Sequence, residues 1–436
     1  MAIYSTQTNQ LRSNNDALYE VVMLSDKYGN PVASGNASGT AADAFGRARI
    51  SSPFTIFDSS HRYRDNGLWA TKVTGTGAAT FIPDQGLVDL TVGNASGDEI
   101  LRETIKVFSY QPGKSLQIMT TFVMGEEKEN LRQRVGYFGE ENGIYMERDG
   151  STTYFVLRSK VSGAVTETRV PQSEWLYDTL DGNGPSRLVL DMDKGHILWM
   201  DIEWLGLGTV RMGLVINGEF IHCHSFHHSN IVTSTYITTA SLPLRMEMTN
   251  TGATVSPSTF KQVCSTVISE GGYELHGKQA SIGTPILTPK TLTTAGTFYP
   301  VVSLRFKEGF EDAVAIITAA SFLGLGNGYV YEWRIIEGAE IATESWTSAG
   351  NNLAIEYTIS GTTITETSDT KTLASGYVQS TNQSSGNINL LRAALFQFQL
   401  GRDSLNGTRR TFTLAVRCNT ATASVYGSLD WEEITR

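Results

Sequence analysis

The stretch HILWMDIEWLGLGTVRMGLVINGEFIHCHSFHH, residues 196–228, is the clearest guide to the fold. Residues 197–205 and 210–216 are rich in large apolar side chains and alternate in the way that half-buried strands do. Asn217-Gly218 follows the second run, and this dipeptide favours a tight hairpin because both turn positions need a positive φ. Residues 220–226 then lead back across the sheet. The stretch therefore predicts a three-stranded antiparallel meander, a unit that stacks into sandwiches and jelly rolls.

The composition extends this prediction to the whole chain. The chain has 436 residues, of which 42 are glycine and only 18% are charged, as in β-rich proteins with many turns. A chain of this length favours two large domains. Residues 98–107, DEILRETIKV, are the one plausible short helix, although the same residues could form a strand.

Short strand patterns separated by turn residues fill most of the sequence after residue 60. Gln-Pro-Gly at 111–113 and Asp-Gly-Asn-Gly at 181–184 are examples of these turns. The pattern predicts an all-β protein. We expect a concanavalin- or laminin-G-like jelly-roll sandwich over residues 61–265, a second β-sandwich over 266–436, and an extended N-terminal arm and anchoring segment over 1–60.

Charge and hydropathy exclude several kinds of partner. The formal net charge is −10, and no basic run exceeds Arg409-Arg410, so we expect no nucleic acid. The most apolar stretch, residues 313–325, is too short to span a bilayer, so we expect no membrane insertion. The polar N-terminus lacks a secretory pattern. Three widely spaced cysteines make a disulfide framework improbable and favour synthesis in a reducing cytoplasm.

Asp201 and Glu203 are two positions apart and are expected to share one face of a strand. The run 199–203 resembles the Glu-x-Asp-x-Glu motif of concanavalin-like glycoside hydrolases, but Trp199 stands where the nucleophilic glutamate would be. Retaining hydrolysis needs two carboxyl groups that flank the bond to be cleaved. We therefore favour a solvent-facing acidic pair and predict no catalytic residue, with a polysaccharide-degrading enzyme as the less favoured alternative.

Four of the seven histidines fall at positions 222, 224, 227 and 228. His222 and His224 are expected on one strand face, where they could supply two corners of a tetrahedral metal site, with His196 or a neighbouring subunit as the third ligand. The sequence has no HExxH motif and no paired CxxC motif. We therefore favour packed histidines and predict no metal and no cofactor, with His222 and His224 as weak metal candidates.

Aromatic residues form a more diffuse signal. Tryptophan and tyrosine bring much apolar area to sandwich cores, and most of those in this chain are expected to be core or interface residues. Their spacing selects no carbohydrate site, although a sugar-stacking platform could lie among Trp69, Trp175, Tyr177, Trp199, Trp204, Tyr236, Trp333, Trp346 and Trp431.

Residues 43–63, DAFGRARISSPFTIFDSSHRY, resemble a segment of structural proteins of tailed bacteriophages, particularly marine ones. In those proteins a D-A-F-G-R-x-R-x-S-x-P-x-T-[LI]-F-D block precedes a β-rich domain. Residues 211–230 and 238–245 are similar to the main domain of the same proteins. The resemblance implies a virion component that is made in the host cytoplasm, and it brings no catalytic residues with it.

The residues and the resemblance together lead to three hypotheses. The first is a non-enzymatic virion structural protein, such as a capsid decoration, fibre or tail-associated subunit. Its arm would bind other virion proteins, and we expect a homo-oligomer, with a trimer as one option. The second is a lectin-like module that binds host surface glycan, and the third is the enzyme named above. The arm residues expected to contact a partner are Phe45, Arg47, Arg49, Phe54 and Phe57.

Overall fold

In a computed structural model, the chain divides into two compact units, Met1–Ser52 and Pro53–Arg436. The structure describes residues 52–434, except for 275, 311, 368–369, 381–385, 390–397, 403–404 and 406–408, together with five backbone strands of the first unit. In that unit β1, β4 and β5 form one sheet and β2 pairs with β3. The bounds of these strands are β1 Tyr4–Thr6, β2 Arg12–Asn14, β3 Ala17–Tyr19, β4 Met23–Ser25 and β5 Pro31–Ala33.

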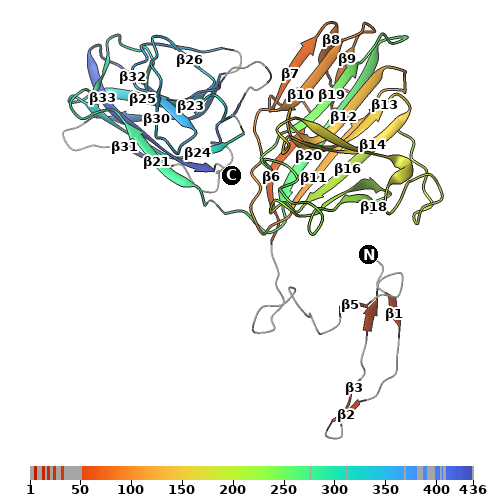
Figure 1. The fold of residues 1–436 in the computed structure, drawn as a ribbon. Helices are drawn as coiled ribbons and strands as arrows, with labels where there is room; N and C mark the ends of the chain where they lie inside the picture. Colours follow the sequence, from red (N-terminus) through yellow and green to blue (C-terminus); the bar gives the residue numbers. More distant parts are fainter. Residues whose placement is uncertain are drawn as a thin grey trace. The chain divides into compact units, whose positions relative to one another are not determined.

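The second unit begins with a sandwich of two antiparallel sheets, which lie face to face in Figure 1. Within the described residues, the first sheet has seven strands in the order β15-β14-β13-β12-β19-β10-β7. Their bounds are β7 Trp69–Thr74, β10 Glu99–Thr104, β12 Leu131–Phe138, β13 Gly143–Asp149, β14 Thr152–Ser159, β15 Thr166–Pro171 and β19 Leu244–Asn250. A single turn of 3-10 helix, η1 (Gln172–Glu174), follows β15.

The second sheet of this sandwich has eight strands among the described residues, in the order β18-β17-β16-β11-β20-β9-β8, with β6 paired to β20. Leu198 and Met200 face the first sheet and pack in a core shared by both sheets. The bounds are β6 Phe54–Ser60, β8 Gly77–Ile82, β9 Leu87–Val92, β11 Leu116–Val123, β16 Gly195–Ile202, β17 Val210–Ile216, β18 Glu219–Phe226 and β20 Ser258–Ser269.

A second sandwich, with a core of its own, follows β20. One sheet has the order β21-β33-β24-β31 with β22 paired to β33, the other has the order β27-β28-β23-β32-β25-β30, and β26 pairs with β29. The bounds are β21 Lys278–Gly283, β22 Lys290–Leu292, β23 Tyr299–Phe306, β24 Val314–Leu325, β25 Val330–Glu337, β26 Glu340–Ile341, β27 Thr347–Ser348, β28 Ile355–Thr358, β29 Ile364–Thr365, β30 Lys371–Gln379, β31 Gly386–Asn389, β32 Phe412–Cys418 and β33 Ala423–Ile434.

The structure confirms the predicted all-β fold and the predicted meander. β16, β17 and β18 are consecutive antiparallel neighbours, and Asn217 and Gly218 join the last two with φ values of 54° and 80°. Within residues 98–107, Glu99–Thr104 form strand β10, which pairs with β7 on one side and β19 on the other, so the strand alternative holds and the short helix does not. In the described part of the chain, no helix is long and apolar enough to cross a membrane.

Candidate functional site

Four rings form a continuous strip on the outer face of β16–β18, and we call them the aromatic strip: Tyr177, His222, Trp199 and Phe220. The centroids of Tyr177 and His222 are 4.2 Å apart, and Trp199 lies 5.8 Å from both His222 and Phe220. Tyr177 and Phe220 are 43% and 53% exposed, whereas Trp199 is 6% exposed.

Glycine at position 213 lets the Trp199 indole cross the sheet. A Cβ atom at Gly213 would lie 2.9 Å from Nε1 of Trp199 and would overlap the Ile221 carbonyl oxygen. Because the position has no side chain, Trp199 Nε1 reaches across β17 and donates to that carbonyl at 3.3 Å. Trp199 stands where the Glu-x-Asp-x-Glu motif has its nucleophilic glutamate, and in the structure it is a packed member of the aromatic strip.

A β-bulge in β18 separates the two histidines that were weak metal candidates. Met212 pairs with His224 and the next residue, Gly213, pairs with His222, so Cys223 is the extra residue. His222 consequently faces outward, whereas His224 faces the core beside Phe226. The prediction that His222 and His224 share one face is wrong, because a bulge shifts the alternation by one residue. Within the described residues, no group of three or more His, Cys, Asp or Glu is placed to hold a metal ion.

The predicted acidic pair is also separated. Asp201 lies on the outer face of β16, where it is 5% exposed and accepts hydrogen bonds from Arg211 and Ser115. Strand β16 ends at Ile202, so Glu203 lies beyond the strand, where one of its oxygens accepts from the backbone of Thr209 at 3.2 Å. The predicted solvent-facing acidic pair on one strand is therefore wrong, because Asp201 is buried and Glu203 lies beyond the end of β16.

A groove runs along the side of the sandwich where β15 and β18, the edge strands of the two sheets, lie. We call it the hydroxyl groove. Its volume is about 570 Å³. Among the described residues that line it there is no Asp, Glu, Lys or Arg, and hydroxyl side chains predominate. They are Leu157, Ser159, Val161, Ser162, Thr166, Thr168, Ser225, Phe226, His227, His228, Val232, Ser234, Thr235 and Tyr236.

His227 connects the hydroxyl groove to the aromatic strip. Its Nε2 lies 3.3 Å from the Tyr177 hydroxyl, and its Nδ1 lies 3.3 Å from the Thr209 hydroxyl. The neighbouring His228 stacks on Tyr236 with centroids 3.9 Å apart and an interplanar angle of 5°. Burial lowers the pKa of both His228 and His222, so these two rings are uncharged at neutral pH. The lining of the groove and the four rings of the strip include no Asp, Glu, Lys or Arg among the described residues.

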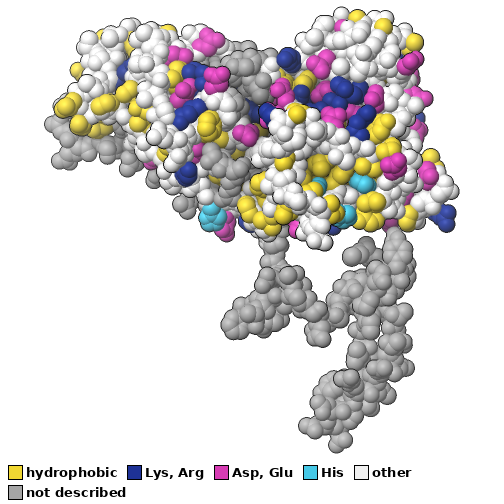
Figure 2. Space-filling view, viewed as in Figure 1, with side chains coloured by type: hydrophobic (Ala, Val, Ile, Leu, Met, Phe, Trp, Pro, Cys, Tyr) yellow, Lys and Arg dark blue, Asp and Glu magenta, His cyan; other side chains and the backbone are white. Residues whose placement is uncertain are grey.

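The outer face of the seven-stranded sheet has the opposite character. Arginine and glutamate alternate across its strands, and we call this arrangement the charge ladder. Arg134 contacts Glu147 at 2.6 Å and Glu247 at 3.1 Å, although Glu147 is 0% exposed. Figure 2 shows the two signs interleaved on this face. The other members are Glu103, Asp149, Arg158, Glu167, Arg169 and Arg245.

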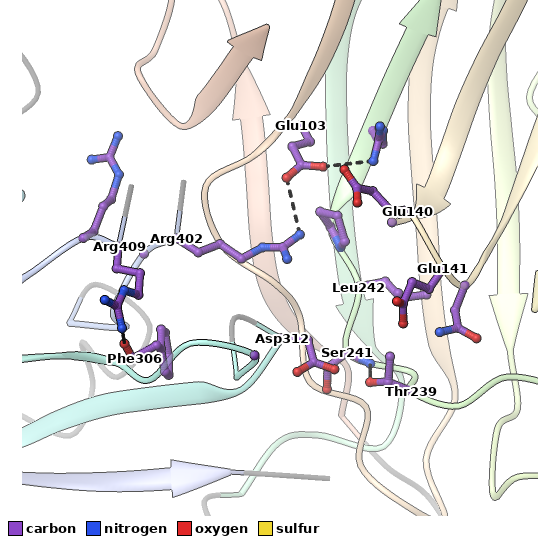
Figure 3. Close-up of a pocket in the computed structure, with 17 residues that line it drawn as sticks. Glu103, Glu140, Glu141, Thr239, Ser241, Leu242, Phe306, Asp312, Arg402 and Arg409 are labelled. Carbon is purple, nitrogen blue, oxygen red and sulfur yellow. Dashed lines mark hydrogen bonds and ion pairs between the residues drawn. The ribbon is translucent and has the colours of Figure 1, made fainter. Parts of the chain in front are cut away.

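One end of the charge ladder continues into a charged pocket of about 410 Å³ that residues of both sandwiches line. Figure 3 shows Glu103 between two guanidinium groups: Arg402 lies 3.4 Å from one carboxylate oxygen, and Arg245 lies 3.5 Å from the other. Glu140, Glu141 and Asp312 also line this pocket. Acidic and basic side chains therefore both line this pocket, whereas neither kind is among the described residues that line the hydroxyl groove.

Three of the predicted partner-binding residues, Phe45, Arg47 and Arg49, lie outside the described residues. Phe54 begins β6, is 37% exposed and lies 6.1 Å from the Tyr273 ring. Phe57 packs in the sandwich core, 4.9 Å from Phe108. The ring of Phe57 is therefore occupied within its own chain.

Sequence reasoning missed the charge ladder and the hydroxyl groove. The sequence did contain a signal for the ladder. Charged residues stand two positions apart at 132 and 134, at 147 and 149, and at 245 and 247, so the two members of each pair share one face of their strand. The groove had none, since serine and threonine are spread through the whole chain. Tyr177 was one of many aromatic candidates, and its place beside His222 depends on how the segment after η1 crosses β18.

Comparisons with known proteins found similar solved structures and no family. No protein family and no curated protein matches it. Similar solved structures include the CBM2 module of the evolved Dit protein of Lactobacillus casei BL23 phage J-1, with 8% identity, a TM-score of 0.33, and 52% of this chain and 100% of that one covered. Peanut lectin has 10% identity and a TM-score of 0.27, with 50% and 98% covered.

A third similar structure is the receptor-binding domain of botulinum neurotoxin D, with 11% identity and a TM-score of 0.31. The match covers 50% of this chain and 50% of that one, so the chain spans half the length of this neighbour. At these identities the likeness concerns the fold alone.

Proposed function

We propose that this chain is a non-enzymatic structural protein of a tailed bacteriophage virion, assembled through its N-terminal residues 1–60 and displaying the two sandwiches. The resemblance of residues 43–63 to phage structural proteins supports the identity of the particle. Binding to other virion proteins and homo-oligomerisation belong to this proposal.

The observation that carries the proposal is how the resembling segment joins the sandwich. The segment runs into β6, which pairs with β20 from Phe54 to Ser60 inside the eight-stranded sheet. Phe57 adds a core contact with Phe108. The C-terminal part of the resembling segment is therefore a hydrogen-bonded strand of the sandwich itself.

The pKa shifts of two carboxyl groups, Glu167 and Glu433, are consistent with the non-enzymatic part. Burial would raise the pKa of Glu167, but the hydrogen bond from Tyr145 and the charges of Arg134 and Arg158 outweigh it and hold the pKa below its usual value. A glycosidase acid needs a raised pKa. Burial does raise the pKa of Glu433, but this residue is 1% exposed in the second sandwich and is inaccessible to a polymer.

The proposal is tested by a truncation that removes residues 1–45. The truncated gene is expressed during infection by a phage whose own copy is disabled, and purified particles are analysed by mass spectrometry. We expect the truncated chain to be absent from particles but folded in the cell lysate. Incorporation at the level of the full-length chain would contradict the proposal, and the full-length gene supplied in the same way is the control.

A second candidate function is glycan binding by the first sandwich. The hydroxyl groove and the aromatic strip favour it, because hydroxyl and aromatic side chains together complement the polar and apolar surfaces of a sugar. The two functions are compatible, since a structural subunit on a virion can also bind the host surface.

A further inference from the structure

We propose that the hydroxyl groove binds an uncharged polysaccharide chain, which continues from the groove across His227 onto Tyr177. This inference rests on the second candidate function, glycan binding, and names its site and ligand class. It is independent of assembly through the N-terminal segment.

The absence of charge along the groove selects the class of ligand. A polyanion such as a uronate or a sulfated glycan needs arginine or lysine, and none lies among the described residues that line the groove. Among the histidines in the lining, His228 is uncharged at neutral pH because burial lowers its pKa. Hydroxyl groups both donate and accept hydrogen bonds, and therefore match a ligand covered with hydroxyl groups. Thr166, Thr168 and Ser234 supply such groups at exposed positions.

The exposed aromatic rings can contact the apolar face of a sugar ring. One face of a hexose ring presents mainly C–H groups, which pack on aromatic faces, while the hydroxyl groups at its rim find polar partners. Tyr177 is 43% exposed, and the His222 ring stabilises its position from 4.2 Å away. Tyr177 also contacts His227, which lines the groove, so a sugar on Tyr177 lies next to sugars in the groove.

The position of the groove favours a polymer over a single sugar. It lies beside the edge strands β15 and β18, and His227 joins it to the exposed Tyr177 ring, so a chain of several sugars finds contacts beyond the groove itself. Its volume of about 570 Å³ lies within the range of roughly 300–1,000 Å³ that is usual for ligand sites. The charged pocket beside Glu103 and Arg402 is the competing site, and it would bind a charged ligand through ion pairs instead.

The test measures binding of the full-length chain to immobilised neutral polymers (dextran, mannan, amylose and galactan) and acidic ones (alginate, heparin and chondroitin sulfate). We expect binding to at least one neutral polymer. Its Kd should change less than twofold between 50 and 500 mM NaCl, because binding without ion pairs is not screened by salt.

Two variants and two matched controls locate the site. Tyr177→Ala removes the exposed ring, and Thr168→Arg places a charged, bulky side chain in the groove. Each should weaken binding at least tenfold. The controls are Tyr377→Ala, at a tyrosine that is 72% exposed in the second sandwich, and Thr152→Arg, at an exposed position of β14 that does not line the groove. Thermal unfolding of all four proteins verifies that they fold.

Each outcome has a separate meaning. Neutral binding that is weakened by both test variants and by neither control supports the inference. Binding to a neutral polymer that survives both test variants overturns the site but leaves the glycan-binding function standing. Binding to acidic polymers alone, weakened by salt, overturns the inference in favour of the charged pocket. No binding to any polymer overturns both the inference and the glycan-binding function.

Discussion

At the scale of single residues, His224 links the bulge in β18 to the stability of the sandwich. The ring lies in the core, 4.7 Å from Phe226, and is 5% exposed. Burial first, and the nearby His222 and His227 to a smaller extent, lower its pKa to about 4. The folded state therefore holds an uncharged imidazole, whereas the unfolded chain protonates near the usual value of 6.5.

We predict that His224 makes the first sandwich less stable as the pH falls. Between pH 6.5 and 4 the unfolded chain binds more protons than the folded one, so the free energy of unfolding decreases as acid is added. For a folded pKa of about 4, the loss from pH 7 to pH 5 is on the order of 2 kcal/mol. The measurement is urea unfolding of the wild type and His224→Leu at both pH values.

The His224→Leu variant should lose about 2 kcal/mol of the wild-type difference between pH 7 and pH 5, and the remainder comes from other histidines whose pKa burial lowers, such as His222 and His228. The matched control is His276→Leu, since the His276 side chain is 67% exposed. A wild-type difference that persists unchanged in His224→Leu would contradict the prediction.

At the scale of strands, Gly213 sets how closely β17, β18 and the Trp199 ring can approach. We predict that Gly213→Ala destabilises the sandwich by about 1–3 kcal/mol, because the new methyl group overlaps the Ile221 carbonyl and crowds Trp199 Nε1. Chemical unfolding measures the loss. Gly195→Ala in β16 is the control, since a Cβ atom there would lie 3.8 Å from its nearest neighbour, a side-chain carbon of Val123. Equal stability of the two variants would show that the close approach is not required.

The charge ladder gives a second prediction at this scale. Arg134→Met should destabilise the protein by about 3–5 kcal/mol, because Glu147 and Glu247 would keep buried charges with fewer partners. Lys160→Met breaks an ion pair with Glu141 whose side chains are 40% and 52% exposed, and should cost less than about 1 kcal/mol. Similar losses measured by urea unfolding would mean that the ladder is a set of ordinary surface pairs.

The strands also show how far the sequence predicts the structure. Alternation and the Asn217-Gly218 turn are local signals, and they predicted β16, β17, β18 and the sandwich built from them. The bulge at Cys223 was not predictable, because it depends on the pairing of two strands and leaves no mark in either one. For the same reason, only the structure shows on which face of the sheet His222 and His224 lie, and that Tyr177 lies beside His222. The hydroxyl groove joins β14–β15 to residues 225–236, and no local pattern links these segments.

At the scale of the whole molecule, the division at Ser52 separates the leader from the two sandwiches. Since Pro53–Arg436 forms a compact unit that includes β6, we predict that removing residues 1–45 leaves its thermal unfolding midpoint unchanged. Differential scanning calorimetry of the truncated and full-length chains tests this. A large decrease in the midpoint would mean that the leader stabilises the sandwiches, and loss of incorporation into particles would then have a second explanation.

The most direct test of assembly through the leader is a cryo-EM map of particles that contain this protein. The proposal predicts density for residues 1–52 on the surface of neighbouring subunits, while β6 stays paired with β20 in its own sandwich. A map in which these residues contact only their own chain, while other surfaces make the contacts to the particle, would contradict it.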